Sequence, residues 1–279
     1  MAEAPSVLIT GCSTGIGRAL SLELARRGCQ VFGSARRPET LADLTEVGGT
    51  ALALDVTRPA SIAEAVDAAI AQAGRIDMLI NNAGINVFGP LAEVPQEAVS
   101  RMFETNVHGL LAVTQAVFPH MAKARRGRIV NIGSVVGLLP TPFAGPYCAT
   151  KAAVHMLSEV LRTEAAPFGI DVVVVQPGGV RSSIADSGAA DLSRYEREDS
   201  LYYWVRAGIA KRTRASQANP MSAEDFAREV VPKLLSRRAP AVIRAGRGAR
   251  LYPALSRLPA KARAALVARL FHLDRPMPA

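Results

Sequence analysis

The chain has 279 residues, a net charge of +9, 49% apolar residues and 20% charged residues. These proportions are typical of a globular protein with a substantial core, and they exclude an intrinsically disordered chain. Three cysteines are too few for a disulfide framework and favour a reducing compartment. We find no signal peptide and no apolar run of the roughly 18 residues that a membrane-spanning helix needs. We therefore expect a cytoplasmic protein.

Short apolar runs alternate with amphipathic helical patterns along the chain. The predicted strands are residues 6–10, 30–35, 51–54, 78–81, 128–133, 171–176 and 241–244. The predicted helices between them are residues 16–28, 61–73, 96–124, 147–166 and 223–236. Several strands are almost wholly apolar, as expected when both faces of a parallel sheet are covered. The alternation predicts one α/β domain over residues 1–279, a doubly wound parallel sheet of about seven strands (a Rossmann fold) with helices on both faces.

The first predicted strand leads into a glycine-rich turn, Gly11-Cys12-Ser13-Thr14-Gly15-Ile16-Gly17, at the start of the first helix. The first glycine permits a tight turn, the second lets the backbone approach a diphosphate, and the third allows close packing of helix on strand. The helix start also presents free N–H groups to phosphate. The turn predicts a dinucleotide site formed by Gly11, Ser13, Thr14, Gly15, Ile16 and Gly17.

The end of the second predicted strand indicates which dinucleotide is bound. Enzymes that use NAD usually have an acidic residue there, which accepts a hydrogen bond from the ribose 2′-hydroxyl. This chain has Arg36 and Arg37 instead. Guanidinium groups bind phosphate through charge-assisted hydrogen bonds, so we expect both arginines to hold the 2′-phosphate of NADP(H).

Tyr147 and Lys151 are four residues apart in a predicted helix, and Ser134 precedes Tyr147 by thirteen residues. Positions i and i+4 of a helix share one face. A nearby cation favours the ionised phenol, so Lys151 is expected to lower the pKa of Tyr147. Such a tyrosine can exchange a proton with a carbonyl or alcohol oxygen.

In their order along the chain, these motifs resemble the short-chain dehydrogenase/reductase family over roughly residues 6–182. The resemblance implies a catalytic group of Asn106, Ser134, Tyr147 and Lys151, in which Asn106 holds a water that relays protons. It implies that Asp55 and Val56 meet the adenine and that Asn82, Ala83 and Gly84, which follow Asn81, border the adenosine. The resemblance also implies that Lys151 and Tyr147 contact the nicotinamide ribose and that Pro177, Gly178, Val180 and Ser182 flank the nicotinamide. Relatives commonly have Thr at the position of Ser182, a mild departure that keeps the hydroxyl.

The resemblance implies an NADP(H)-dependent oxidoreductase that transfers a hydride between nicotinamide and a carbonyl or secondary alcohol. The amino-acid sequences of the glycine turn and of residues 34–38 are most similar to those of the branch with hydroxysteroid, retinol and acyl-dihydroxyacetone-phosphate reductases. This similarity favours a lipophilic ketone or aldehyde as the substrate. The apolar stretches 135–140 and 202–204 are expected to wall its pocket. A β-ketoacyl thioester reductase is the alternative enzyme. A non-catalytic NADP(H)-sensing or membrane-surface protein is the alternative of another class.

The last quarter of the chain is strongly basic and lies outside these motifs. Residues 206–279 carry 16 Lys and Arg against 4 Asp and Glu. We expect residues 183–220 to form a substrate-binding lid and residues 245–279 a basic helical extension. The extension either packs on the cleft or a subunit interface, or it contacts a membrane surface or an acidic carrier protein. We expect no metal, no nucleic acid, and a homodimer or homotetramer paired through helices 96–124 and 147–166.

Overall fold

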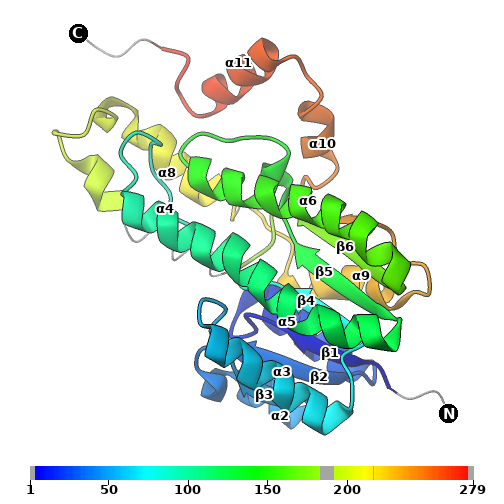
Figure 1. Ribbon diagram of the computed structural model, residues 1–279. Coiled ribbons are helices and arrows are strands. Elements are labelled where there is room, and N and C mark those ends of the chain that lie inside the picture. Colours follow the sequence, from blue (N-terminus) through cyan, green and yellow to red (C-terminus); the bar gives the residue numbers. More distant parts are fainter. Residues whose placement is uncertain (1–3, 183–191, 216, 276–279) are drawn as a thin grey trace.

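The computed structural model describes residues 4–182, 192–215 and 217–275. These residues form a seven-stranded parallel sheet of order β3-β2-β1-β4-β5-β6-β7 (Figure 1). Its strands are β1 (Ser6–Ile9), β2 (Gln30–Ala35), β3 (Thr50–Ala53), β4 (Met78–Asn81), β5 (Gly127–Ile132), β6 (Ile170–Pro177) and β7 (Val242–Ala245). Each lies within one residue of its predicted bounds, so the doubly wound α/β fold predicted from the sequence is confirmed.

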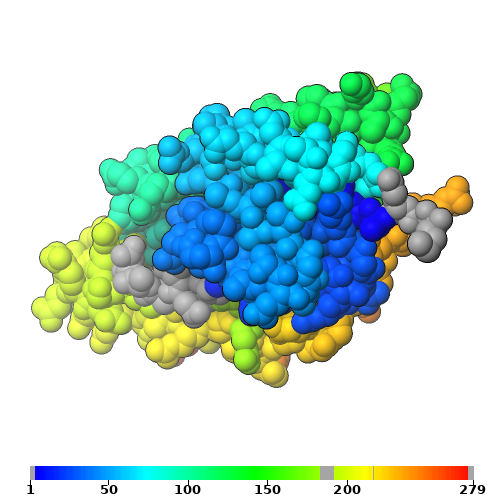
Figure 2. All heavy atoms as spheres, turned by 90° about the horizontal axis from the view of Figure 1, so that it is seen from below, coloured from blue at the N-terminus to red at the C-terminus, as the bar shows by residue number. Residues whose placement is uncertain are grey.

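Helices cover both faces of the sheet. Helices α1 (Gly15–Arg26) and α9 (Ala223–Leu235) pack together on one face, whereas α3 (Pro59–Ala73), α5 (Gly109–Ala124) and α6 (Gly145–Ala165) lie on the other. Figure 2 looks onto the β3 end and shows the blue N-terminal part of the chain between the cyan and green helices and the yellow and orange segments. The sheet is therefore the middle of three layers.

Alternate strand residues supply the two halves of the core. In β1, Val7 and Ile9 belong to the cluster under α1 and α9, whereas Leu8 belongs to the cluster under α3 and α5. Strand β4 repeats the pattern, with Ile80 in the first cluster and Leu79 in the second. Successive side chains of a strand point to opposite faces, so an all-apolar strand is what a sheet buried on both faces requires.

Strand β1 pairs with both β2 and β4, and the direction of sheet growth reverses at this point. From β1 the chain builds outward through β2 to β3, then returns to place β4 on the other side of β1. In open α/β sheets, such a reversal leaves a crevice outside the carboxyl ends of the strands, and ligands bind there. The glycine turn follows β1, so the fold places it at this crevice.

The helix predicted over residues 96–124 is divided into three parts. Helix α4 (Gln96–Phe103) is followed by a π-helical segment, Glu104–His108, and then by α5. Asn106 lies in this wider turn, and its side chain is buried against the backbone of Ile85. Single π-helical turns occur frequently at functional sites. Residue periodicity does not reveal such a local widening.

Several short helices lie outside the predicted set or near the C-terminal end of the chain. They are the 3-10 helix Pro38–Leu41 with α2 (Ala42–Glu46), the 3-10 helices Val135–Gly137, Ala166–Phe168, Leu192–Glu196 and Tyr203–Val205, and the helices α8 (Arg206–Ala215), α10 (Leu251–Leu255) and α11 (Ala260–Leu270). None of the helices in the described ranges has the length and apolarity to cross a bilayer.

The C-terminal segment packs on the part of the chain that was predicted to be a lid. Phe271 and Val267 are buried with Val205, Ile209 and Tyr195 in a cluster of their own. The Gly208 backbone approaches the Phe271 carbonyl so closely that a Cβ at Gly208 would collide with it. Residues 183–191 and 216 of the predicted lid lie outside the described residues.

Candidate active site

One large cleft opens along the carboxyl ends of the strands. Its volume of about 1140 Å³ exceeds the roughly 300–1,000 Å³ typical of a pocket for one drug-sized ligand. The predicted site residues that line it are Gly11, Ser13, Thr14, Gly15, Ile16, Gly17, Arg36, Asp55, Val56, Asn82, Ala83, Gly84, Ser134, Tyr147, Lys151, Pro177, Gly178, Val180 and Ser182. Residues predicted from separate motifs are therefore gathered along a single cleft.

The glycine turn has the backbone geometry that its sequence predicted. Gly11 and Gly15 have φ angles of 72° and 58°, a region that favours glycine. A Cβ at Gly17 would collide with the Gly11 carbonyl oxygen and with Asn82 Nδ2. The third glycine is thus required because the first turn of α1 packs directly against the loops after β1 and β4.

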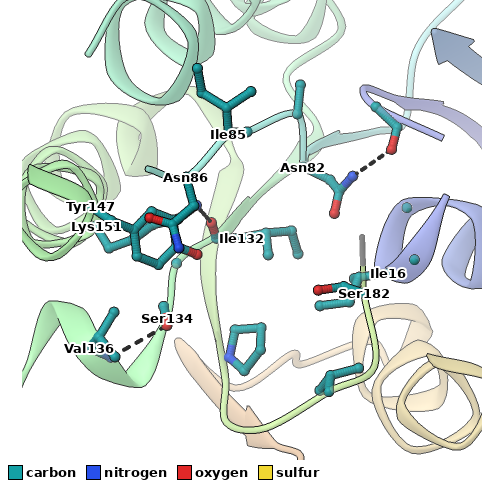
Figure 3. Close-up of a pocket in the computed structure, with 18 of the residues that line it drawn as sticks. Ile16, Asn82, Ile85, Asn86, Ile132, Ser134, Val136, Tyr147, Lys151 and Ser182 are labelled. Carbon is teal, nitrogen blue, oxygen red and sulfur yellow. Dashed lines mark hydrogen bonds between the residues drawn. The ribbon is translucent and has the colours of Figure 1, made fainter. Parts of the chain in front are cut away.

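Asn82 and Thr10 tie these two loops together. Asn82 Nδ2 donates to the carbonyl oxygens of Thr10 and Gly11 at 3.0 and 2.9 Å (Figure 3). In the opposite direction, the backbone N–H groups of Asn82 and Ala83 both donate to Thr10 Oγ1 at 3.0 Å. Four hydrogen bonds therefore fix the glycine turn relative to β4, which gives a phosphate-sized ligand a rigid backbone cradle.

Asp55 and Arg36 lie on the adjacent wall of the cleft. Thr57 donates to Asp55 Oδ1 through its N–H at 3.0 Å and its hydroxyl at 2.7 Å. Partial burial opposes ionisation, but these bonds and the charges of Arg36 and Arg58 hold the pKa of Asp55 below its ordinary value. Arg36 is thus close enough to act on Asp55. Arg37 is exposed and does not line the cleft.

Ser134, Tyr147 and Lys151 lie together on one side of the cleft, and Ile16, Asn82 and Ser182 lie on the other (Figure 3). Ser134 lies two residues after the end of β5, and its Oγ accepts the N–H of Val136 at 3.4 Å. Lys151 Nζ donates to the Ile132 carbonyl at 2.8 Å and lies 5.7 Å from the centroid of the Tyr147 ring.

Burial, rather than the lysine, controls the acidity of Tyr147. Burial raises the pKa of Tyr147 to about 12, although the charge of Arg212 and a hydrogen bond with Ser134 act in the opposite direction. Burial also lowers the pKa of Lys151 to about 8, because its ammonium group has lost most of its hydration. The prediction that Lys151 lowers the Tyr147 pKa is therefore wrong. Loss of hydration at the phenol is the largest cause of the raised pKa, and Lys151 is not among the groups that lower it.

Asn106 lies behind the cleft rather than in its lining. Its Oδ1 accepts the N–H of Ile85 at 2.8 Å, and its Nδ2 donates to the Ile85 carbonyl at 2.9 Å and to Thr150 Oγ1 at 3.1 Å. Asn106 therefore fixes the loop after β4 to the helix that carries Tyr147 and Lys151. Its implied role in holding a water remains a prediction.

The segment after β6 closes the far side of the cleft. Gly178 N–H donates to the Ala245 carbonyl, and Val180 forms a bridge with Met221. A Cβ at Gly178 would collide with the Arg247 carbonyl, so glycine is needed where the two chain segments touch. This short segment is thus anchored at several points. Its residues that line the cleft include Pro177, Gly178, Val180 and Ser182.

Sequence reasoning missed part of the lining. Asn86, Phe88, Arg212, Tyr252 and Phe271 also line the cleft. Asn86 lies only two residues after the motif Asn81-Asn82-Ala83-Gly84, and this proximity could have identified it as a residue of the cleft. Asn86 and Tyr147 both line the cleft and both are labelled in Figure 3. The other four come from segments without a motif.

The predicted walls of the substrate pocket are only partly correct. Val135 and Val136 line the cleft, but the other residues of the 135–140 stretch do not. None of Tyr202, Tyr203 and Trp204 lines it. Tyr202 and Trp204 instead pack against the cluster around Tyr195 and Phe271, because the apolar C-terminal segment covers them. Within residues 4–182, 192–215 and 217–275, no group of three metal-ligating side chains is suited to a metal ion.

Known proteins are similar to this chain in sequence and in fold. The family model for short chain dehydrogenases matches residues 5–192. The chain is 40% identical over 201 residues to a 3-ketodihydrosphingosine reductase from Bacteroides thetaiotaomicron, covering 72% of this chain and 73% of that protein. It is 36% identical over 235 residues to the NADPH-dependent 1-acyldihydroxyacetone phosphate reductase of Schizosaccharomyces pombe, covering 83% and 78%.

Solved structures extend the likeness to almost the whole chain. A short-chain dehydrogenase from Streptomyces avermitilis matches with a TM-score of 0.81 at 29% identity, covering 99% of this chain and 100% of that one. A family member from Burkholderia phymatum in complex with NAD matches with a TM-score of 0.77 at 26% identity, covering 99% of both chains. The chain therefore belongs to the short-chain dehydrogenase/reductase family and is an oxidoreductase that uses a nicotinamide cofactor and acts on the CH–OH group of its donors.

Proposed function

We propose that the protein is an NADP(H)-dependent reductase of a lipophilic ketone or aldehyde. The preference for NADP(H) rests on the end of β2, where Arg36 lines the cleft beside Asp55 and no carboxylate takes the place usual in NAD enzymes. The S. pombe relative is described as NADPH-dependent and the B. phymatum relative contains NAD, so the family includes both choices. Arg36, rather than Arg37, is the residue that we expect to discriminate between them.

The residues of the cleft fit a dinucleotide. The left-handed glycines and the collision that a Cβ at Gly17 would cause leave the backbone of the glycine turn open to a diphosphate. We propose that Asp55, Val56, Asn82, Ala83 and Gly84 hold the adenosine. In the same proposal, Pro177, Gly178, Val180 and Ser182 flank the nicotinamide, and Lys151 and Tyr147 contact its ribose.

The bound cofactor supplies the hydride, and the protein positions the substrate and supplies the proton. We assign proton donation to Tyr147 Oη and orientation of the same substrate oxygen to Ser134 Oγ. A phenol with a pKa of about 12 is protonated at neutral pH, yet it is still more acidic than an aliphatic alcohol. Tyr147 is therefore suited to protonate the alkoxide that forms in the direction of reduction.

Lys151 and Asn106 support this proton donor. Lys151 Nζ, held by the Ile132 carbonyl, places a positive charge beside the Tyr147 ring. We propose that Asn106 contributes the family's water relay from its place between Ile85 and Thr150.

The lining near Tyr147 supports a lipophilic substrate. Ile85, Phe88, Val135, Val136 and Phe271 are apolar residues of the cleft wall. The names of the two curated relatives describe reductases of lipid ketones, which agrees with this lining. A β-ketoacyl thioester is the alternative substrate, with the basic C-terminal quarter as the surface for an acidic carrier protein.

We also propose a homodimer or homotetramer. Leu111 on α5 and Met156 and Val160 on α6 are large apolar side chains exposed on the outer faces of these helices. A partner copy would cover them. The burial of Val267 and Phe271 favours packing of the C-terminal extension on the substrate end of the cleft over insertion into a membrane surface. Light scattering of the full chain measures the stoichiometry.

The proposal is tested by NADPH oxidation with a panel of steroid ketones, retinal, long-chain ketones and β-ketoacyl thioesters. We expect the long-chain or polycyclic carbonyls to give the highest kcat/KM, and we expect a lower KM for NADPH than for NADH. Equal or better use of NADH contradicts the cofactor assignment. Exclusive activity on thioesters contradicts the substrate assignment.

A further inference from the structure

Arg212 is a buried cation in the wall of the cleft. It lies on α8, its side chain is only 6% exposed, and it lines the cleft together with Tyr147 and Phe88. Its Nε donates to Thr141 Oγ1 at 3.0 Å, and its guanidinium carbon lies 5.1 Å from the centroid of the Phe88 ring. The side chain is thus held in place by one hydrogen bond and one aromatic face.

No anion neutralises Arg212 within the described residues. It forms no ion pair with any of them, and Nη1 and Nη2 have no hydrogen-bond partner there. Neither of these two nitrogens is fully buried. Because Arg212 lines the cleft, both remain accessible from it. Four N–H donors of a fixed charge therefore face the space where a substrate would lie.

Such an arrangement is unfavourable unless a ligand completes it. Burial disfavours the charged form and lowers the pKa of Arg212, although the Cys148, Tyr252 and Tyr147 groups oppose the shift. A guanidinium nevertheless stays protonated in proteins, and a buried charge is normally paired. The groups nearest to Arg212 are hydroxyls, a thiol and aromatic rings, none of which is a resident anion of the kind that a carboxylate would supply.

We propose that Arg212 binds an anionic group, a carboxylate or a phosphate, on the substrate. The inference deepens the proposed function and rests on it. The preferred substrate is then a ketone or aldehyde with an apolar chain and one anionic group. The planar guanidinium fork matches both anions through paired N–H···O bonds.

The position of Arg212 separates this anion from the phosphates of the cofactor. Arg212 is held by Thr141, whose hydroxyl is 3.7 Å from Cys148 Sγ, and Cys148 adjoins Tyr147 in the chain. The glycine turn that faces the diphosphate lies across the cleft, on the side of Ile16 and Ser182 in Figure 3. The anion thus belongs to the molecule that approaches Tyr147.

A competing role for Arg212 is to adjust the acidity of Tyr147 and nothing more. Its charge does act to lower the Tyr147 pKa. In that case, loss of Arg212 would change the turnover of charged and uncharged substrates equally and would shift the pH profile of kcat. Substrate binding by an anionic group would instead change the KM of charged substrates alone.

The first test measures binding without turnover. Calorimetry of the full chain with NADP⁺ compares decanoate and decyl phosphate with the neutral decanamide. We expect one of the anions to bind at least about tenfold more tightly than decanamide, and the stronger of the two identifies the anion. Arg212→Met should remove the difference, Arg212→Lys should keep part of it, and the control Arg214→Met, an exposed residue of the same helix, should keep all of it.

The second test measures turnover of 4-oxodecanoate against its methyl ester, with decanoyl-dihydroxyacetone phosphate against its dephosphorylated form as the phosphate arm. We expect Arg212→Met to lower kcat/KM for the anionic member by about 30-fold and for the neutral member by less than about threefold, as for loss of a buried charged partner.

Equal binding of decanoate, decyl phosphate and decanamide by the wild-type chain overturns the proposal without any variant. An equal loss on both members of a pair also overturns it. Anion binding without reduction of any carbonyl would instead contradict the proposed reductase function alone.

Discussion

The two ends of the cleft are built in different ways. At the end where we propose that the cofactor binds, the glycine turn and the loop after β4 present backbone groups, and four hydrogen bonds between Thr10, Gly11, Asn82 and Ala83 fix these loops to the ends of two central strands. At the substrate end, side chains from distant segments form the wall, among them Phe88, Arg212 and Phe271. These side chains belong to loops and short helices. The short helices pack on one another rather than on the sheet.

This difference shows how one fold serves many substrates. A backbone site on strand ends cannot change without disturbing the sheet, which suits the nicotinamide cofactor that we propose it binds. A side-chain site on peripheral helices can change residue by residue while the sheet remains intact. Changes to the glycine turn should therefore affect folding and cofactor binding together, whereas changes at the substrate end should affect substrate KM and leave cofactor binding unchanged.

The largest effect on stability is expected for Gly17→Ala. The added Cβ would collide with the Gly11 carbonyl and Asn82 Nδ2, and overpacking of this kind destabilises by up to about 3 kcal/mol. Gly145→Ala is the control, because its Cβ would meet only the flexible end of exposed Leu91. Urea denaturation and NADPH titration should show loss of both stability and affinity for Gly17→Ala. Unchanged NADPH affinity in that variant would separate the turn from cofactor binding.

Lys151, at the boundary between the two ends, gives a pH-dependent effect. Its pKa of about 8 in the folded chain lies below its ordinary value of 10.5. The unfolded chain therefore binds more protons between these values, and the free energy of unfolding rises with pH in that window. Between pH 8 and 9.5 we expect the wild type to gain up to about 2 kcal/mol relative to Lys151→Met, at 1.36 kcal/mol per pH unit. Parallel stability curves for the two proteins would contradict the depressed pKa.

Arg36 and Arg37 form a matched pair at the cofactor end. Arg36→Asp should raise the KM for NADPH about 30-fold, corresponding to the roughly 2 kcal/mol of a charged hydrogen bond, and should improve the use of NADH. Arg37→Asp should change either KM by less than about threefold, because Arg37 is exposed and outside the cleft. The KM values of both variants for NADPH and NADH decide which arginine binds the 2′-phosphate.

Phe271 tests the independence of the substrate end. Phe271→Ala should raise the KM of an apolar carbonyl about tenfold, or about 1.4 kcal/mol, and leave the Kd for NADPH unchanged. The neighbouring Leu270→Ala, at an exposed position, is the control. A comparable loss of NADPH affinity would show that the two ends are coupled.

The cofactor end could be predicted from the sequence because its parts are local. Gly11, Gly15 and Gly17 form one continuous turn, and Asn82 directly follows the buried strand β4. The bounds of the strands could also be predicted, since short continuous apolar runs between helical patterns are typical of buried parallel strands. Local sequence patterns therefore predicted the fold and the glycine turn. The family resemblance supplied most of the other motif residues that line the cleft, whereas the predicted residues Arg37 and Asn106 do not line it.

The substrate end could not be predicted because its residues meet only through tertiary packing. Arg212 is one of 33 basic residues, and nothing in its neighbours along the chain indicates that it is buried. The aromatic run Tyr202-Tyr203-Trp204 gave a misleading signal, since none of the three lines the cleft and Tyr202 and Trp204 pack against the cluster that contains Phe271. The raised pKa of Tyr147 also depends on burial, which residue spacing does not report.

The most direct test of the division of the cleft is the Tyr147→Phe variant, assayed for turnover and for NADPH binding in the same preparation. Loss of the proton donor should reduce kcat by about 10³-fold, within the range of general acid catalysis. The Kd for NADPH should stay within about threefold of the wild type, because the glycine turn, Asn82 and Arg36 are unchanged. Retention of most of the kcat would contradict the assignment of Tyr147 as the proton donor, and loss of NADPH binding would contradict the separation of the two ends.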